Sequence, residues 1–83
     1  MIRNAKVGER VVVIDGSEGG AFSLSEDRRI KVYWPKGTRH GFVMEIWGRS
    51  GGKFSIGVIP DLERHPKAFG MRWFRAKELA REK

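Results

Sequence analysis

Cysteine is absent from the sequence, so disulfide bonds and thiolate metal sites are excluded. Long hydrophobic runs are absent too: the longest, residues 11–14, is far shorter than the roughly 20 apolar residues that span a membrane. The residues after Met1 lead straight into strand-like sequence, without the apolar core and cleavage site of a secretory signal. We therefore expect a cytoplasmic protein that has no disulfides and no membrane as its partner.

Acidic side chains are the minority, with 10 Asp and Glu against 17 Lys and Arg, which gives a net charge of +7. Residues 1–27 hold three basic and five acidic residues, a net charge of −2, whereas residues 28–83 hold 14 basic and five acidic residues, a net charge of +9. Such one-sided charge favours a polyanionic partner, and we expect nucleic acid or an acidic protein surface. The simpler alternative is a basic surface that only keeps a small protein soluble.

Alternating hydrophobicity and β-branched residues predict short strands along the chain. We expect them at residues 11–15, 29–34, 41–47, 53–59 and 70–74. Long loops are expected at residues 15–28 and 60–70, and the helix formers in Arg75–Lys83 predict a short C-terminal helical turn. Because 83 residues support one domain and five short strands are too few for two full sheets, we predict a mostly β domain whose bent sheet closes into a five-stranded barrel.

The alternation also predicts which side chains face the core. The expected inner faces hold Ile30, Val32 and Trp34; Phe42, Met44 and Ile46; and Phe54, Ile56 and Val58. Trp34 and Trp73 are expected to be largely buried, in the core or at its rim, and Arg29 and Lys31 to be exposed. Trp47 falls opposite the expected inner face of its strand, where it is either an exposed binding residue or packed under a loop.

Four segments of the chain resemble the SH3-like barrel family, which includes the KOW and Tudor-like modules. They are residues 7–13, 41–46, 53–59 and 73–79, which follow the pattern VGxxV … GxVxxI … strand … W-[FV]-x-A-x-x-L. The resemblance covers most of the chain except the two long loops. It implies a small barrel and concerns the fold more than the function.

The chain departs from particular members of that family. KOW modules usually continue closely from the first strand into the second, whereas residues 17–27 intervene here. A Tudor-like methyl-lysine reader would need an aromatic cage, for which Tyr33, Trp34, Trp47 and Phe69 are the available rings. The trimethoprim-resistant type of dihydrofolate reductase has a similar barrel with a Val-Gln-Ile-Tyr strand. The matching residues here are Met71-Arg72-Trp73-Phe74, so the resemblance does not imply that activity.

No pattern in the sequence indicates catalysis. The two histidines, His40 and His65, belong to no Cys/His cluster, so we expect no metal and no cofactor. No serine lies in a nucleophile-elbow context, and the glycine-rich stretches lack the Gly-Lys-Ser/Thr of a phosphate-binding loop. We therefore predict a binding protein that is not an enzyme, and keep a small-molecule enzyme as the third alternative.

Basic and aromatic side chains are interleaved over residues 28–40. This pattern suits single-stranded nucleic acid, whose phosphates pair with Lys and Arg and whose bases stack on aromatic rings. A solvated outer strand face would show the same pattern. The candidate binding residues are Arg28, Arg29, Lys31, Tyr33, Lys36, Arg39, Trp47, Arg49, Lys53 and Arg72.

The predicted function is a non-catalytic module that binds nucleic acid through these residues. The alternative is a protein-interaction module, such as a small regulator or inhibitor that docks on an acidic surface of a host protein. In that case Trp47 and Phe69 would be the anchors.

Overall fold

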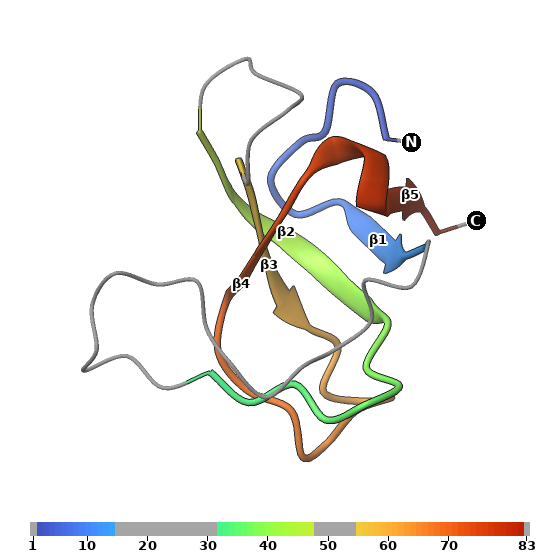
Figure 1. The fold of residues 1–83 in the computed structure, drawn as a ribbon, viewed down its shortest axis with the longest axis vertical. Helices are drawn as coiled ribbons and strands as arrows, with labels where there is room; N and C mark the ends of the chain where they lie inside the picture. Colours follow the sequence, from blue (N-terminus) through green and yellow to red (C-terminus); the bar gives the residue numbers. More distant parts are fainter. Residues whose placement is uncertain (1, 15–31, 48–54, 83) are drawn as a thin grey trace.

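Five antiparallel strands form one sheet in this computed structural model, which describes residues 2–14, 32–47 and 55–82 (Figure 1). The elements are β1 (Arg10–Val13), β2 (His40–Ile46), β3 (Ile56–Pro60), β4 (Arg72–Phe74), the 3₁₀ turn η1 (Ala76–Glu78) and β5 (Leu79–Arg81). The strand order is β4-β3-β2-β1-β5, so the described strands form an open sheet with β4 and β5 at its edges. The mostly β class predicted from the sequence is confirmed.

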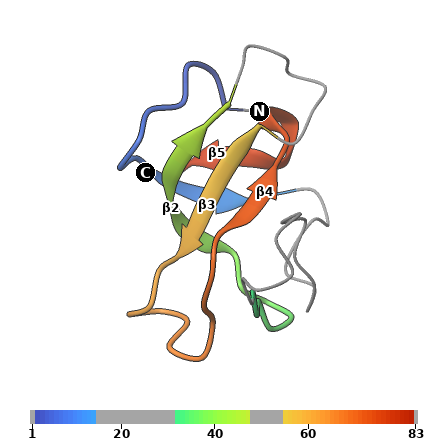
Figure 2. The ribbon, with the colours of Figure 1, turned by 90° about the vertical axis from the view of Figure 1, so that its left-hand side faces the viewer.

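The sheet is strongly bent. Figure 2 shows β2, β3 and β4 side by side, with β1 and β5 crossing behind them. The core fills the space between these two parts, and its side chains come from every strand. They are Ile2, Val11, Val13, Val32, Trp34, Val43, Ile56, Val58, Phe74 and Leu79. Trp34 is fully buried, as predicted, with its ring centroid 5.5 Å from that of Phe74.

The predicted inner face of β2 is wrong. Val43 is buried, whereas Met44 and Ile46 are exposed and Phe42 is only half-buried. The alternation favours the face of Phe42, Met44 and Ile46, because the other face holds only one apolar side chain, that of Val43, beside Gly41 and Glu45. The pairing decides otherwise, because Val43 lies opposite the core residue Val58, and a bulge at Met44 changes the register beyond it.

The C-terminal prediction is right for one turn and wrong for the rest. Ala76–Glu78 form the 3₁₀ turn η1, and the backbone N–H of Arg75 donates to the Glu78 carboxylate at 2.8 Å. Leu79–Arg81 then form β5, which pairs with β1 and buries Leu79 completely. These residues favour a helix locally, but they form a strand because they pair with the edge of β1 and bury Leu79 in the core.

The strand predicted at residues 29–34 is not part of the sheet over its described residues. There, Tyr33 makes a single bridge to Phe69, and residues 29–31 lie outside the described residues. In the next strands, Ile56 and Val58 are buried as predicted, but Trp73 is only half-buried. Trp73 pairs with Gly57, so it lies on the outer face of the sheet. No helix within the described residues is long and apolar enough to cross a membrane.

Candidate nucleic-acid interface

Two described segments that are far apart in sequence meet at one end of the molecule. They are residues 32–39, before β2, and residues 61–71, between β3 and β4 (Figure 1). Tyr33 and Phe69 join them through two backbone hydrogen bonds, 2.8 Å from the Tyr33 N–H and 2.9 Å from the Phe69 N–H. The indole N–H of Trp34 donates to the carbonyl of Gly70 at 2.9 Å. These three hydrogen bonds fix the junction through both the backbone and a side chain.

Tyr33 and Phe69 form an exposed aromatic pair. Their ring centroids lie 5.9 Å apart with the planes inclined by 49°, so the rings do not stack face to face. The exposed fractions are 41% for Tyr33 and 49% for Phe69, although the neighbouring Trp34 and Ala68 are buried. The buried neighbours hold the backbone, and the two rings extend into solvent.

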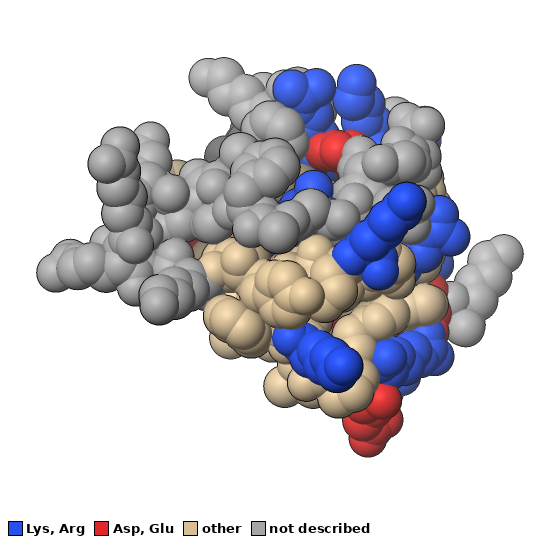
Figure 3. All heavy atoms as spheres, turned by 60° about the horizontal axis from the view of Figure 1, so that its bottom comes forward, with Lys and Arg blue, Asp and Glu red and all other residues tan. Residues whose placement is uncertain are grey.

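A shallow groove of about 330 Å³ is lined by residues that follow Tyr33 and by residues that precede Phe69 in the chain. One wall is the tight turn Pro35–Thr38, in which Gly37 has φ +93° and both the N–H and the hydroxyl of Thr38 donate to the Pro35 carbonyl. The residues that line the groove are Pro35, Lys36, Gly37, Thr38, Arg64, His65, Pro66, Lys67 and Ala68. None of these described residues is acidic. In Figure 3, which brings this end forward, Lys and Arg side chains border an uncharged surface.

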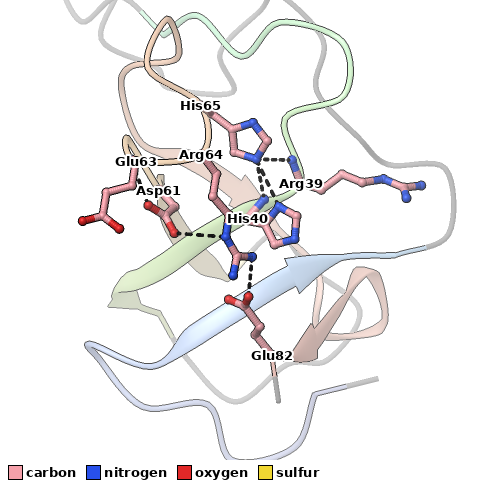
Figure 4. A network of polar contacts seen from close by, with 7 residues as sticks. All are labelled: Arg39, His40, Asp61, Glu63, Arg64, His65 and Glu82. Atoms are coloured by element: carbon pink, nitrogen blue, oxygen red, sulfur yellow. Dashed lines mark hydrogen bonds and ion pairs between the residues drawn. The ribbon is translucent and has the colours of Figure 1, made fainter.

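Arg64 pairs with two acidic residues, Asp61 and Glu82 (Figure 4). Asp61 is buried, its carboxylate accepts the N–H of Glu63 at 3.1 Å, and Arg64 Nε lies 3.9 Å from its other oxygen. Glu82 lies at the C-terminal end of the described chain. These contacts shape residues 61–65 and partly neutralise the carboxylates of Asp61 and Glu82, while the side chain of Glu63 is exposed.

His65 connects the groove to the start of β2. Its Nε2 accepts the backbone N–H groups of Arg39 and His40 at 3.4 and 3.3 Å, and lies 3.1 Å from Nδ1 of His40 (Figure 4). The two rings stack with centroids 5.3 Å apart. Partial burial lowers the pKa of His65, and the nearby His40 and Arg64 lower it further, against the opposing effect of Asp61. The neutral form of His65 is therefore favoured.

The structure brings together part of the predicted site. Lys36 lines the groove, Tyr33 lies shortly before the Pro35–Thr38 turn, and Arg39 is exposed just after it, with its side chain extending away from the histidine pair in Figure 4. Trp47 is exposed, but it follows the opposite end of β2. There its ring meets that of Trp73 edge-on, with the two ring centroids 6.0 Å apart. Arg28, Arg29, Lys31, Arg49 and Lys53 lie outside the described residues.

Arg72 does not lie at the groove. Its guanidinium is half-buried over the rings of Trp34 and Phe74, at 6.0 and 4.9 Å from their centroids. Burial lowers its pKa. The sequence predicts Arg72 as a binding residue, but Arg72 pairs with the core residue Val58 and so lies on the inner side of β4.

The structure adds Arg64, Lys67 and Phe69 to the two segments that carry Tyr33 and Lys36. The basic cluster Arg64-His65-Pro66-Lys67 is visible in the sequence, but nothing in the sequence says that it faces Lys36. The four rings considered for an aromatic cage do not converge, since Trp34 is buried and Trp47 lies beyond the far end of β2. An aromatic cage of these four rings is therefore excluded.

Among the residues that the structure describes, no group of three or more His, Cys, Asp or Glu side chains is placed to hold a metal ion. No protein-family model, curated protein or solved structure matches this chain.

Proposed function

We propose that the protein is a non-catalytic nucleic-acid-binding module that holds the phosphate backbone along the groove between the Pro35–Thr38 turn and residues 64–68. The observation that carries the proposal is the composition of this groove. Lys36, Arg64 and Lys67 line it, no described residue of its lining is acidic, and the same two segments carry the exposed rings of Tyr33 and Phe69. Cations beside exposed rings match a ligand with regularly spaced negative charges and flat apolar bases.

We also propose that the fold is a small barrel of the SH3-like type. The bend of the sheet supports this, because it sets β1 and β5 across β2, β3 and β4 with the core between them (Figure 2). The return of the chain through η1 to pair β5 with β1 supports it as well. Folds of this kind serve many functions, so the functional proposal depends on the groove and not on the barrel.

The test is a salt titration of binding to a fluorescently labelled oligonucleotide. Each phosphate that is neutralised contributes about −0.7 to −0.9 to the slope of log affinity against log salt. Lys36 and Lys67 are both exposed and line opposite walls of the groove. Replacing both with Ala is therefore expected to flatten the slope by about one to two and to weaken binding to all sequences alike.

The matched control is Lys6→Ala with Lys77→Ala. Both lysines are exposed, both lie in segments away from the groove, and the change in net charge is the same. A control pair that flattens the slope as much as the groove pair would show diffuse attraction by net charge instead of a site. Absence of measurable binding at low salt would overturn the nucleic-acid function.

The second candidate function is a protein-interaction module for an acidic partner, which Trp47 favours. Its exposed fraction is 64%, and exposed Trp residues often dominate binding energies. Its indole N–H donates to Glu45 at 2.7 Å, which fixes the ring in place. For a module of this kind, Trp47→Ala would abolish binding to the protein partner, and the Lys36/Lys67 substitutions would mainly slow association.

A further inference from the structure

We infer that the ligand is single-stranded and that an unpaired base stacks on the Tyr33–Phe69 pair while the adjoining phosphates lie along the groove. This inference rests on the proposed function and specifies its substrate class. It distinguishes a strand with free bases from a duplex, both of which would be attracted by the same positive charge.

The first argument is the chemistry of the exposed surface. The Tyr33 and Phe69 rings offer apolar π faces, and the Tyr33 hydroxyl is the single side-chain hydrogen-bonding group of the pair. The edge of a base presents donors and acceptors, whereas its face is flat and apolar. The pair therefore matches the face of a base, which is available only when the base is not stacked within a duplex.

The second argument is rigidity. The reciprocal backbone hydrogen bonds between Tyr33 and Phe69 fix both residues before any ligand arrives. The buried indole of Trp34, bound to the Gly70 carbonyl, holds the next residue on each segment. Because little ordering is needed on binding, the stacking energy is retained as affinity.

The third argument is the order of the aromatic rings and the lysines along the chain. Tyr33 is followed by Pro35 and Lys36 on one wall, and Phe69 is preceded by Lys67 and Ala68 on the other. Cations thus flank the rings on both segments. A base stacked on the rings would have its phosphates near lysines that are two and three positions away along the chain, which is the arrangement that single-strand binding requires.

The fourth argument concerns what duplex recognition would need. Reading a duplex by its major groove usually takes an α-helix or a two-stranded ribbon that projects into it. Within the described residues, the helical structure is the three-residue turn η1, and the groove is formed by two short loops. The described part of this end of the molecule offers a shallow surface with two rings, not a projecting element.

The experiment measures affinity for a labelled single-stranded oligonucleotide and for the same strand annealed to its complement. We expect the single strand to bind at least about tenfold more tightly than the duplex, because stacking on an aromatic ring contributes about 1–3 kcal/mol per base. Phe69→Leu keeps an apolar side chain at an exposed position but removes the ring. It is expected to weaken single-strand binding by about 5- to 150-fold, which is the stacking energy converted to a ratio of affinities, and to leave duplex binding unchanged.

Two further variants sharpen the result. Tyr33→Leu removes the other ring of the pair and is expected to weaken single-strand binding within the same range as Phe69→Leu. Trp47→Leu makes the matching aromatic-to-aliphatic change at an exposed site beyond the far end of β2, and it is expected to have no effect. Thermal unfolding of each variant is expected to match the wild type, since all three side chains are exposed.

The outcomes separate the two levels of the proposal. Equal affinity for single strand and duplex, with no effect of Phe69→Leu, would overturn the single-strand inference and leave nucleic-acid binding standing. A loss on Trp47→Leu as large as that on Phe69→Leu would also overturn the placement of the base. Failure of the wild type to bind either form at low salt would overturn the proposed function itself.

Discussion

His65 Nε2 lies 3.1 Å from His40 Nδ1 and also accepts the backbone N–H of His40 at 3.3 Å. A nitrogen that accepts a backbone N–H carries no proton, so the proton shared by the two rings resides on His40 Nδ1. Protonation of His65 on Nε2 would remove its acceptor and leave N–H donors on both sides of the contact. The contact between residues 61–68 and the start of β2 therefore depends on a neutral His65.

Stability is expected to decrease as the pH falls below the ordinary histidine pKa of about 6.5. The pKa of His65 is lowered in the folded protein, chiefly by burial and then by His40, while Asp61 opposes the shift. The unfolded chain therefore binds more protons than the folded protein between the folded and unfolded pKa values. As a result, the free energy of unfolding decreases as the pH falls through that window. Above the unfolded pKa this contribution is fully present.

The measurement is the free energy of unfolding in urea at several values between about pH 7.5 and 5.5, above the range in which most carboxylates titrate. His65→Gln retains an amide oxygen that accepts a backbone N–H but does not titrate. Its stability is expected to change less over this range than that of the wild type. An equal decrease in the variant would show that His65 is not responsible.

Gly41→Ala is expected to destabilise the protein by at least about 1–3 kcal/mol, as overpacking of a core does. A Cβ at Gly41 would overlap the Ile59 carbonyl oxygen and the Val58 side chain, and the backbone of β3 cannot easily move away. Gly57→Ala is the control, because its Cβ would meet only the flexible side chain of Met71. Chemical denaturation of both variants tests this, and an equal loss at both positions would contradict it.

Leu79→Ala is expected to lower the free energy of unfolding by about 2–5 kcal/mol, as for other fully buried leucines. Leu79 has no exposed surface and pairs with Val13 at the start of β5. Lys77→Ala in the preceding turn is the control and is expected to change stability by less than about 0.5 kcal/mol, because Lys77 is exposed. If Leu79→Ala were as mild as the control, β5 would not be an integral strand.

The contrast between β1 and β5 shows how far sequence alone predicts this fold. Val11-Val12-Val13 is β-branched, so its local preference and its final structure agree. Leu79-Ala80-Arg81 prefers a helix locally and becomes a strand only through pairing with β1, about 68 positions earlier in the chain. Long-range pairing overrides local preference there, and no pattern within the segment reveals it.

The same distinction applies to the candidate site. Tyr33 and Lys36 were found because basic and aromatic residues are interleaved in one continuous stretch. Lys67 and Phe69 come from a stretch more than 30 positions later, which the Tyr33–Phe69 bridge and the Trp34–Gly70 hydrogen bond join to the first stretch. Arg72 was assigned to the interface by its charge alone, and the sequence could not show that its strand turns it toward the core rings.

Replacement of Arg72 separates a structural role from a binding role. The side chain lies over Trp34 and Phe74, and its Nη1 is buried without a hydrogen-bond partner, which disfavours the charged form. Arg72→Met keeps the apolar stem and removes this charge, so stability is expected to stay within about 1 kcal/mol of the wild type or to rise. The salt slope of oligonucleotide binding is expected not to change, because the guanidinium neutralises no phosphate.

Urea unfolding and the same salt titration measure both effects. Arg72→Ala is the companion variant, and it is expected to lose stability because it also removes the apolar stem and its packing. A slope flattened by about one in both variants would instead assign Arg72 to the interface.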